Sequence, residues 1–258
     1  MVTNIEISGF TEELLDALVK AGIYGSKTEA IRDAVRKLLE SYDMKDISLR
    51  AYRNGSVSFQ LAAEISGLSM DGLMWYFLSR DTVPRLGSED LAEVNQGRDF
   101  INEHNAVVFD LSSLYAIVEL GLLALVQKVN KRLTVSAKTM ERAKAFIMRI
   151  SKMKGAPMLF TGIEVLSVNK ALQEFARRNG ISLQEAHAIY IAKKSKAVLL
   201  SDDVVTRQVA RTHGVAACPS VSLLLFMLNN SIISDKEFKE LISKMGTLPY
   251  MVPKDFIA

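Results

Sequence analysis

Hydrophobic and polar positions over 1–45 predict one short strand and two amphipathic helices. Apolar and polar residues alternate over 3–8, which is the period of a strand with one buried face. Apolar residues then recur at helical spacing over 11–21 and again over 27–42. Ser26 stands directly before the second pattern, so it is expected to cap that helix.

A second helical unit is predicted over 46–97. Helices are expected over 58–66 and 69–79, with Ser69 as the cap of the second, and their spacing is that of a helix-turn-helix. The second helix is strongly apolar over 74–78, where a groove-reading helix would be basic. That surface is expected either to dock on the C-terminal domain or to pack within its own unit.

The pattern changes after a polar stretch at 81–104, which predicts a domain boundary with one short helix over 88–94. Over 98–258, short apolar runs alternate with helical patterns, the signature of a parallel sheet flanked by helices. The expected strands are 106–109, 197–200 and 215–218, and the expected late helices are 219–228 and 235–245. The fold class is therefore α/β at the C-terminus with a mainly α N-terminal region.

Composition narrows the kinds of site and partner. The 258 residues carry a formal charge of +3, which permits a nucleic-acid partner without requiring one. The single cysteine and three scattered histidines argue against a disulfide and against a zinc site. The N-terminus lacks the pattern of a signal peptide, and charged residues interrupt the longest apolar stretch. These features predict a cytoplasmic protein with no membrane partner.

Carboxylates follow two of the predicted strands. Asp110 comes directly after 106–109, and Asp202 and Asp203 come just after 197–200. Carboxyl ends of parallel strands face the ligand crevice of an open α/β sheet, and oxygen ligands suit Mg²⁺ or Mn²⁺. Glu185, in the first turn of an alanine-rich helix, is a further candidate. The simpler alternative is that such acids only cap the helices that follow them.

Residues 105–245 resemble the PIN-domain nucleases. The matching segments are Asp110-Leu-Ser-Ser-Leu, Gln184-Glu185-Ala186 and Asp202-Asp203-Val-Val-Thr-Arg207. The resemblance implies metal-dependent cleavage of single-stranded RNA, with Asp110, Glu185 and Asp203 as ligands of Mg²⁺ or Mn²⁺. Asp202 is then a further ligand or a water-orienting group, and together these four acids are the expected catalytic residues.

The resemblance also suggests supporting residues, and the sequence departs from the family pattern. Ser112 is expected to hydrogen-bond behind the metal ligands. Arg207 and Arg211 either hold a substrate phosphate or form salt bridges. The segment 135–142 lacks the usual proline pair and has Arg142 where a carboxylate is expected. Because Ser182 and Gln184 also replace typical family residues, the acidic site is incomplete, and a weak or inactive PIN fold is the alternative.

Residues 2–42 resemble a ribbon-helix-helix DNA-binding module, and 52–69 resembles small antitoxin-like helix-turn-helix proteins. The first resemblance implies a homodimer or higher oligomer whose paired strands enter the major groove. The nucleic-acid contacts that it implies, besides Arg207, are Asn4, Glu6, Ser8, Ser26 and Lys27. Glu6 departs from the pattern, because an acid on the groove-reading face repels DNA unless it accepts from cytosine. A ribbon that only dimerises is the alternative.

The predicted organisation is a ribbon-helix-helix region over 1–45, an antitoxin-like helix-turn-helix over 46–97 and a PIN-like domain over 98–258. The leading hypothesis is a metal-dependent endoribonuclease fused to, and restrained by, its own antitoxin-like DNA-binding region. The rival is a non-catalytic DNA-binding regulator with a degenerate PIN domain used for oligomerisation. A scaffold that binds neither metal nor nucleic acid is the third alternative.

Overall fold

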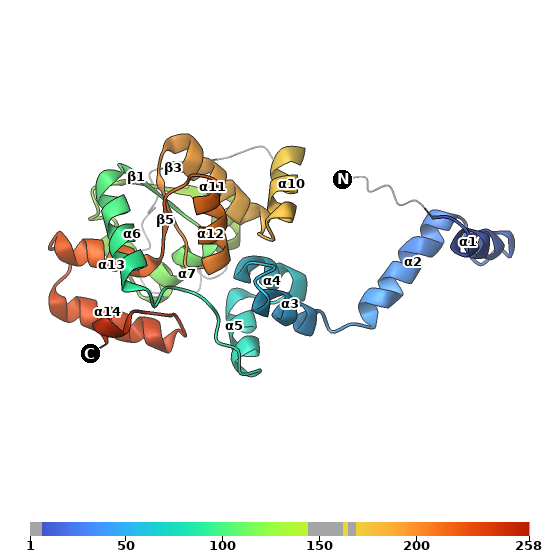
Figure 1. Ribbon diagram of the computed structural model, residues 1–258, viewed down its shortest axis with the longest axis horizontal. Coiled ribbons are helices and arrows are strands. Elements are labelled where there is room, and N and C mark those ends of the chain that lie inside the picture. The colour runs from blue at the N-terminus through green and yellow to red at the C-terminus, as the bar shows by residue number, and fades with distance from the viewer. Residues whose placement is uncertain (1–6, 144–161, 165–168, 258) are drawn as a thin grey trace.

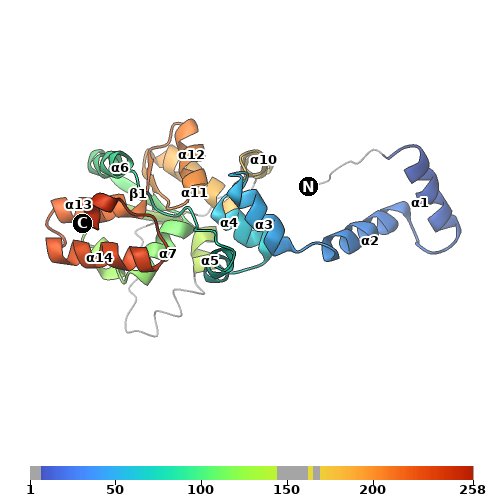
Figure 2. The ribbon, with the colours of Figure 1, turned by 60° about the horizontal axis from the view of Figure 1, so that its bottom comes forward.

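The computed structural model describes residues 7–143, 162–164 and 169–257 of the chain. Figure 1 shows a two-helix hairpin projecting to one side, a unit of short helices, and a sheet covered by helices. Figure 2, turned about the long axis, shows the hairpin standing clear of the sheet from a second direction. The C-terminus lies at the opposite end of the molecule from the hairpin (Figure 1).

The C-terminal region is built on a parallel five-stranded sheet in the order β3-β2-β1-β4-β5. The chain moves outward in one direction from β1 to β3 and in the other from β4 to β5, so the order reverses between β1 and β4. Ligands of open α/β sheets bind at such a reversal. The strands are β1 (Ala106–Phe109), β2 (Arg132–Ser136), β3 (Gly162–Glu164), β4 (Val198–Leu200) and β5 (Ala217–Cys218).

Helices cover both faces of this sheet, which explains the continuous apolar runs of the strands. Val108 and Leu199 pack with α10, α11 and α12, whereas Val107 and Leu200 pack with α6, α7, α13 and α14. Residues 137–143 are also helical. The bounds are α7 (Leu111–Glu119), α8 (Leu123–Val126), α10 (Lys170–Arg178), α11 (Leu183–Ser195), α12 (Val204–Thr212), α13 (Ser220–Asn229), α14 (Asp235–Thr247) and the 3-10 helix η1 (Lys254–Phe256).

The N-terminal hairpin consists of α1 (Phe10–Lys20) and α2 (Lys27–Glu40). Ser26 caps α2 as predicted, since its hydroxyl accepts from the Glu29 N–H. The two helices bury little apolar surface, and several large side chains stay exposed: Phe10, Leu14, Ile23, Val35, Leu38, Leu39 and Tyr42. Most of the strand predicted over 3–8 lies outside the described residues. Its last two residues are in no regular element of the single chain.

The predicted helix-turn-helix pair is present as α4 (Phe59–Ser66) and α5 (Met70–Leu78), preceded by α3 (Met44–Arg53). Ser69 caps α5 as expected. The rings of Tyr52, Phe59 and Phe77 lie 5.1–5.6 Å apart between their centroids and hold the three helices together. Met74 and Phe77 are buried in one cluster with side chains of the sheet domain, so α5 packs both within its unit and toward that domain.

The polar stretch after α5 forms a longer helix than the sequence predicts. Instead of a short helix over 88–94, α6 spans Leu91–Glu103 and is capped by Asp90. Its buried face is only Val94, Gly97 and Ile101, a stripe that the surrounding polar residues obscured. At Gly97 a Cβ atom would lie 2.3 Å from the Ser222 hydroxyl, so only glycine allows α6 to approach α13 this closely. Helix α6 runs across the division expected between 97 and 98.

Candidate active site

Asp110 leaves the end of β1 and begins α7. One carboxylate oxygen accepts the Ser113 N–H at 2.9 Å and the Ser112 hydroxyl at 2.8 Å. The other accepts the Ser201 hydroxyl at 2.5 Å, from the end of β4. Asp110 therefore caps its helix, as the simpler alternative holds, and is at the same time tied to the neighbouring strand.

The two adjacent aspartates after β4 point to different partners. Asp203 caps α12 through the Thr206 N–H at 3.1 Å, and its second oxygen accepts the Phe59 N–H at 2.5 Å. Asp202 instead accepts both the N–H and the hydroxyl of Ser220, at 2.8 and 2.7 Å, at the start of α13. Asp202 therefore helps to join β4 to α13, and Asp203 is the acid of this pair that faces α4.

Glu185 enters the same region from the start of α11. It forms a capping box with Ser182, whose N–H donates to the Glu185 carboxylate at 2.7 Å. The hydroxyls of Thr206 and Ser58 also donate to this carboxylate, each at 2.6 Å. Glu185 is fully buried. Its partners come from the start of α4, the start of α11 and from α12.

Burial and mutual repulsion disturb the acid–base properties of these carboxylates. Burial, together with the nearby Asp203 and Asp110, raises the pKa of Glu185 to about 8. Burial likewise raises the pKa of Asp203 to about 6 and that of Asp202 to about 7, and it raises the pKa of Asp110. Asp110, Glu185 and Asp203 therefore form a group of buried carboxyl groups that hold their protons more tightly than exposed ones.

This donor set has the right chemistry for a hard divalent cation. Mg²⁺ and Mn²⁺ prefer carboxylate oxygens, and Asp110, Glu185 and Asp203 offer them. Within the ranges that the structure describes, however, no three acidic, histidine or cysteine side chains are arranged to hold an ion. Two of the three acids are hydrogen-bonded to Ser58 and Phe59 instead.

The start of α4 covers the acids. Ser58 caps this helix and is fully buried, and a helix N-terminus carries a partial positive charge. The Ser58 N–H donates to the Gly180 carbonyl at 2.8 Å. The backbones approach closely at this point, because a Cβ atom on Gly180 would lie 2.0 Å from the Ser56 carbonyl oxygen. Sequence reasoning expected 74–78 as the surface that docks on the C-terminal domain, and it did not identify the contacts of Ser58 and Phe59.

Comparison with known proteins agrees with this architecture. A family model described as a PIN domain, DUF3368, matches residues 106–258, which is more than half of the chain. The chain belongs to this PIN-domain family. No curated protein matches it. The crystal structure of PAE2754 from Pyrobaculum aerophilum matches 46% of this chain and 96% of its own, at 18% identity and a TM-score of 0.36. The family match and the parallel sheet confirm the expected α/β PIN-like domain.

Arg207 lies inside the PIN domain and does not fit the phosphate contact that was expected of it. It is 2% exposed, and its guanidinium donates to Glu93 and to the carbonyls of Gly87, Ser201 and Asp202. Burial alone would raise the pKa of Glu93, but Arg207 and its other partners lower it overall. The salt-bridge alternative therefore describes Arg207, and Arg211 also pairs with Glu93, at 2.6 Å.

The N-terminal nucleic-acid candidates are only partly described. Asn4 and Glu6 lie outside the described residues, and Ser8 is exposed. Lys27 pairs with Asp16 at 2.8 Å and Glu12 at 3.3 Å, both on α1, so its charge is partly offset. DNA contacts at these positions remain predictions.

Histidine and cysteine metal sites and membrane-spanning helices were not expected from the sequence. In the described part of the chain, no histidine or cysteine belongs to a metal-binding group, and Cys218 is a buried free thiol. No helix there has the length and apolar character needed to cross a membrane.

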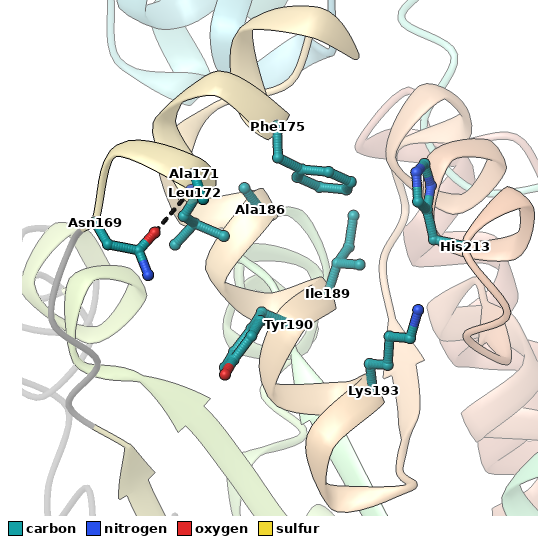
Figure 3. Close-up of a pocket in the computed structure, with 9 residues that line it drawn as sticks. All are labelled: Asn169, Ala171, Leu172, Phe175, Ala186, Ile189, Tyr190, Lys193 and His213. Carbon is teal, nitrogen blue, oxygen red and sulfur yellow. Dashed lines mark hydrogen bonds between the residues drawn. The ribbon is translucent and has the colours of Figure 1, made fainter. Parts of the chain in front are cut away.

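One cavity of the PIN domain lies away from the acids. It has a volume of about 490 Å³ and is formed by α10, α11 and the end of α12. Figure 3 shows the Phe175 ring beside His213, with Tyr190 and Lys193 along α11. None of the four candidate acids lines it, so it is separate from the candidate active site.

Proposed function

We propose that this PIN-domain protein is a metal-dependent endoribonuclease that acts on single-stranded RNA. The observation that carries the proposal is the convergence of Asp110, Glu185 and Asp203 where the strand order of the sheet reverses. The three acids come from separate elements, and their raised pKa values are what a cation site has before the cation offsets the repulsion.

Asp110, Glu185 and Asp203 would hold Mg²⁺ or Mn²⁺. When bound there, such an ion would supply a water molecule of lowered pKa and would neutralise charge on the phosphodiester. Ser112 and Ser201 fix the orientation of the Asp110 carboxylate. Thr206 does the same for Glu185 through its hydroxyl. These hydroxyls hold the carboxylates in place before a cation binds.

Metal affinity is expected to be weak, because the acidic set is small. The segment after β2 contributes Arg142 where the family resemblance leads us to expect a carboxylate, and the neighbouring Glu141 is exposed. Asp202 is held by Ser220 rather than facing the other acids.

We also propose that the N-terminal region restrains the nuclease. Ser58 and Phe59 take hydrogen-bonding positions on Glu185 and Asp203 that metal binding needs. The positive end of α4 is a weak substitute for a cation at the same acids. Metal binding and docking of α4 are therefore expected to exclude each other.

Cleavage of a mixed single-stranded RNA pool in Mn²⁺ tests both parts of the proposal. Ser58→Asp keeps a good helix cap but places a carboxylate against Glu185, so we expect release of α4 and cleavage raised by about tenfold or more. Ser69→Asp makes the same change at the exposed cap of α5 and should leave cleavage as it is. Adding Asp203→Asn to Ser58→Asp should abolish cleavage. If Ser58→Asp neither cleaves RNA nor binds Mn²⁺ by calorimetry, the chain is not a nuclease.

One observation favours the rival function, a DNA-binding regulator. The exposed apolar side chains of α1 and α2 suit a homodimer, which a ribbon-helix-helix protein needs in order to bind DNA. Salt-dependent binding of duplex DNA that is lost on removing residues 1–45 would support DNA binding. Such binding together with inactive Ser58→Asp protein would make the regulator the better description.

A further inference from the structure

The surface of α11 beneath α4 is more polar than a permanent core requires. Gln184 and Glu185 are both buried there, and the Nε2 atom of His187, two residues further along α11, is buried with no hydrogen-bond partner among the described residues. A buried polar atom without a partner costs stability, so a face that evolved only to pack against α4 would be apolar. This face of α11 therefore has the character of a polar binding surface.

Glu64, on the second turn of α4, meets the cationic part of this surface. Its carboxylate is 3.3 Å from a guanidinium nitrogen of Arg142. With the Gln184 amide in the orientation that satisfies both of its ends, Gln184 donates to Glu64 at 2.8 Å and accepts from Arg142 at 2.8 Å. The three side chains thus form one hydrogen-bonded cluster next to Glu185.

Lys138 adds a second positive charge to the same place. Burial raises the pKa of Glu64, and Arg142 and Lys138 lower it in part. Lys138 lies four positions before Arg142 in the helical residues 137–143, so the two side chains share one face of that helix. Arg142 and Lys138 both belong to the helical residues that follow β2, so one short element supplies both cations.

The start of α4 therefore contacts acidic side chains of the PIN domain, and its second turn contacts cationic ones. Ser58 and Phe59 meet the acids, whereas Glu64, six residues later and roughly 9 Å along a helix, meets the cations. A strand of RNA passing over the acids would need a cation at the cleaved phosphate and basic side chains at a neighbouring one. Arginine suits the second purpose because its planar guanidinium binds phosphate through paired hydrogen bonds.

We infer that Arg142, Gln184 and Lys138 form a subsite for a backbone phosphate of single-stranded RNA, and that Glu64 occupies this subsite as a carboxylate stand-in. The inference rests on the proposed nuclease function for its substrate class. It also gives Arg142 a role at the position where the family resemblance leads us to expect an acid.

RNA binding by the full chain, without divalent metal, tests the subsite apart from catalysis. We would titrate a labelled single-stranded RNA of mixed sequence in EDTA and follow its fluorescence anisotropy over a range of salt concentrations. Glu64→Gln removes the competing charge but keeps the side-chain size, so the RNA is expected to bind about fivefold tighter or more. Glu240→Gln makes the same charge change on the exposed face of α14 and serves as its control.

Arg142 is tested in protein that carries Ser58→Asp, in which α4 is displaced. Adding Arg142→Gln should weaken RNA binding and lower the slope of log affinity against log salt by about 0.7, the value for one phosphate contact with a single strand. Lys236→Gln, on exposed α14, should change neither the affinity nor the slope by as much. Thermal unfolding of each variant identifies any loss that comes from misfolding.

The outcomes separate this inference from the proposed function. If Arg142→Gln behaves like Lys236→Gln, or Glu64→Gln binds RNA no tighter than Glu240→Gln, the subsite does not exist. If the Ser58→Asp protein does not bind RNA, the subsite likewise does not exist. If RNA binds as expected but no variant cleaves it in Mn²⁺, the subsite stands and the nuclease proposal falls.

Discussion

At the scale of single residues, three of the four candidate acids also hold the start of a helix. Asp110 and Asp203 cap α7 and α12, and Glu185 closes a capping box on α11. Capping explains why these acids sit at helix starts, but it requires neither complete burial nor grouping. Grouping buried carboxylates costs stability, and proteins usually bear such a cost at functional sites. The capping and metal-ligand interpretations therefore apply to the same side chains.

The raised pKa values predict how stability depends on pH. In the folded protein Glu185 and Asp203 keep protons that the unfolded chain releases near pH 4, so their protonation favours the folded state at low pH. That stabilisation is lost as pH rises through about 6 and 8. In EDTA we expect Tm to fall by about 5 °C or more between pH 5 and pH 8.

A neutral isostere tests the origin of that dependence. Glu185→Gln should raise Tm at pH 8 and flatten the profile, whereas Glu240→Gln on exposed α14 should leave it unchanged. A wild-type Tm that rises from pH 5 to pH 8 would contradict the assignment. Saturating Mn²⁺ should restore wild-type stability at pH 8, because the cation offsets the repulsion.

At the scale of elements, a buried ion pair joins α6 to α12. Arg207 is 2% exposed, and Glu93 on α6 accepts from its guanidinium at 3.0 Å. Removing one member of such a pair leaves the other charge buried without its counterion. The position of α6 on the PIN domain thus depends on Arg207, for which the sequence left both phosphate binding and salt bridging open.

The Glu93–Arg207 pair predicts a large stability loss on substitution. Glu93→Gln should lower the free energy of unfolding in urea by about 3 kcal/mol. Asp235→Asn, which removes an exposed ion pair with Lys239, should change it by less than about 1 kcal/mol. Equal losses in the two variants would show that burial of the pair does not matter.

A second element-scale prediction concerns the contact between the helix unit and the PIN domain. Gly180 has a φ of 63°, and a Cβ there would collide with the Ser56 carbonyl oxygen. Gly180→Ala should therefore loosen the start of α4 from the acids and increase RNA cleavage in Mn²⁺. Gly214→Ala is the matched control, because Gly214 also has a positive φ but an added Cβ meets nothing within 4 Å. Equal cleavage by both variants would argue against restraint by α4.

At the scale of the whole molecule, the hairpin of α1 and α2 is the part least supported by the rest of the chain. It stands away from the sheet in both views (Figures 1 and 2), and its large apolar side chains are exposed. Exposed apolar surface of this kind marks protein interaction sites. A second copy of the hairpin is the partner that the proposed ribbon-helix-helix module requires.

Sedimentation of the full chain tests this assembly. The wild-type protein is expected to be a dimer or a higher oligomer, and Leu38→Glu should shift it toward the monomer, since Leu38 is 55% exposed on α2. Arg36→Glu, a charge change on the same helix, should leave the oligomer in place. A wild-type monomer at micromolar concentration would overturn the prediction.

The sequence by itself determined the helices and strands whose formation depends on residues close together in the chain. Apolar runs and capping residues gave β1, β4, α11 and α12, and the acids at their ends gave the candidate site. These features follow from hydrogen bonds and side-chain periodicity over a few residues, so they can be recognised locally. The family match confirmed the PIN domain that the resemblance of residues 105–245 implied.

Only the tertiary structure decided which acid faces which partner. Asp202 and Asp203 are adjacent in sequence, yet one binds α13 and the other binds α4. The contacts of Ser58 with Glu185 and of Phe59 with Asp203 join residues 127 and 144 positions apart. Such contacts depend on how finished elements pack against one another, and no local pattern records that.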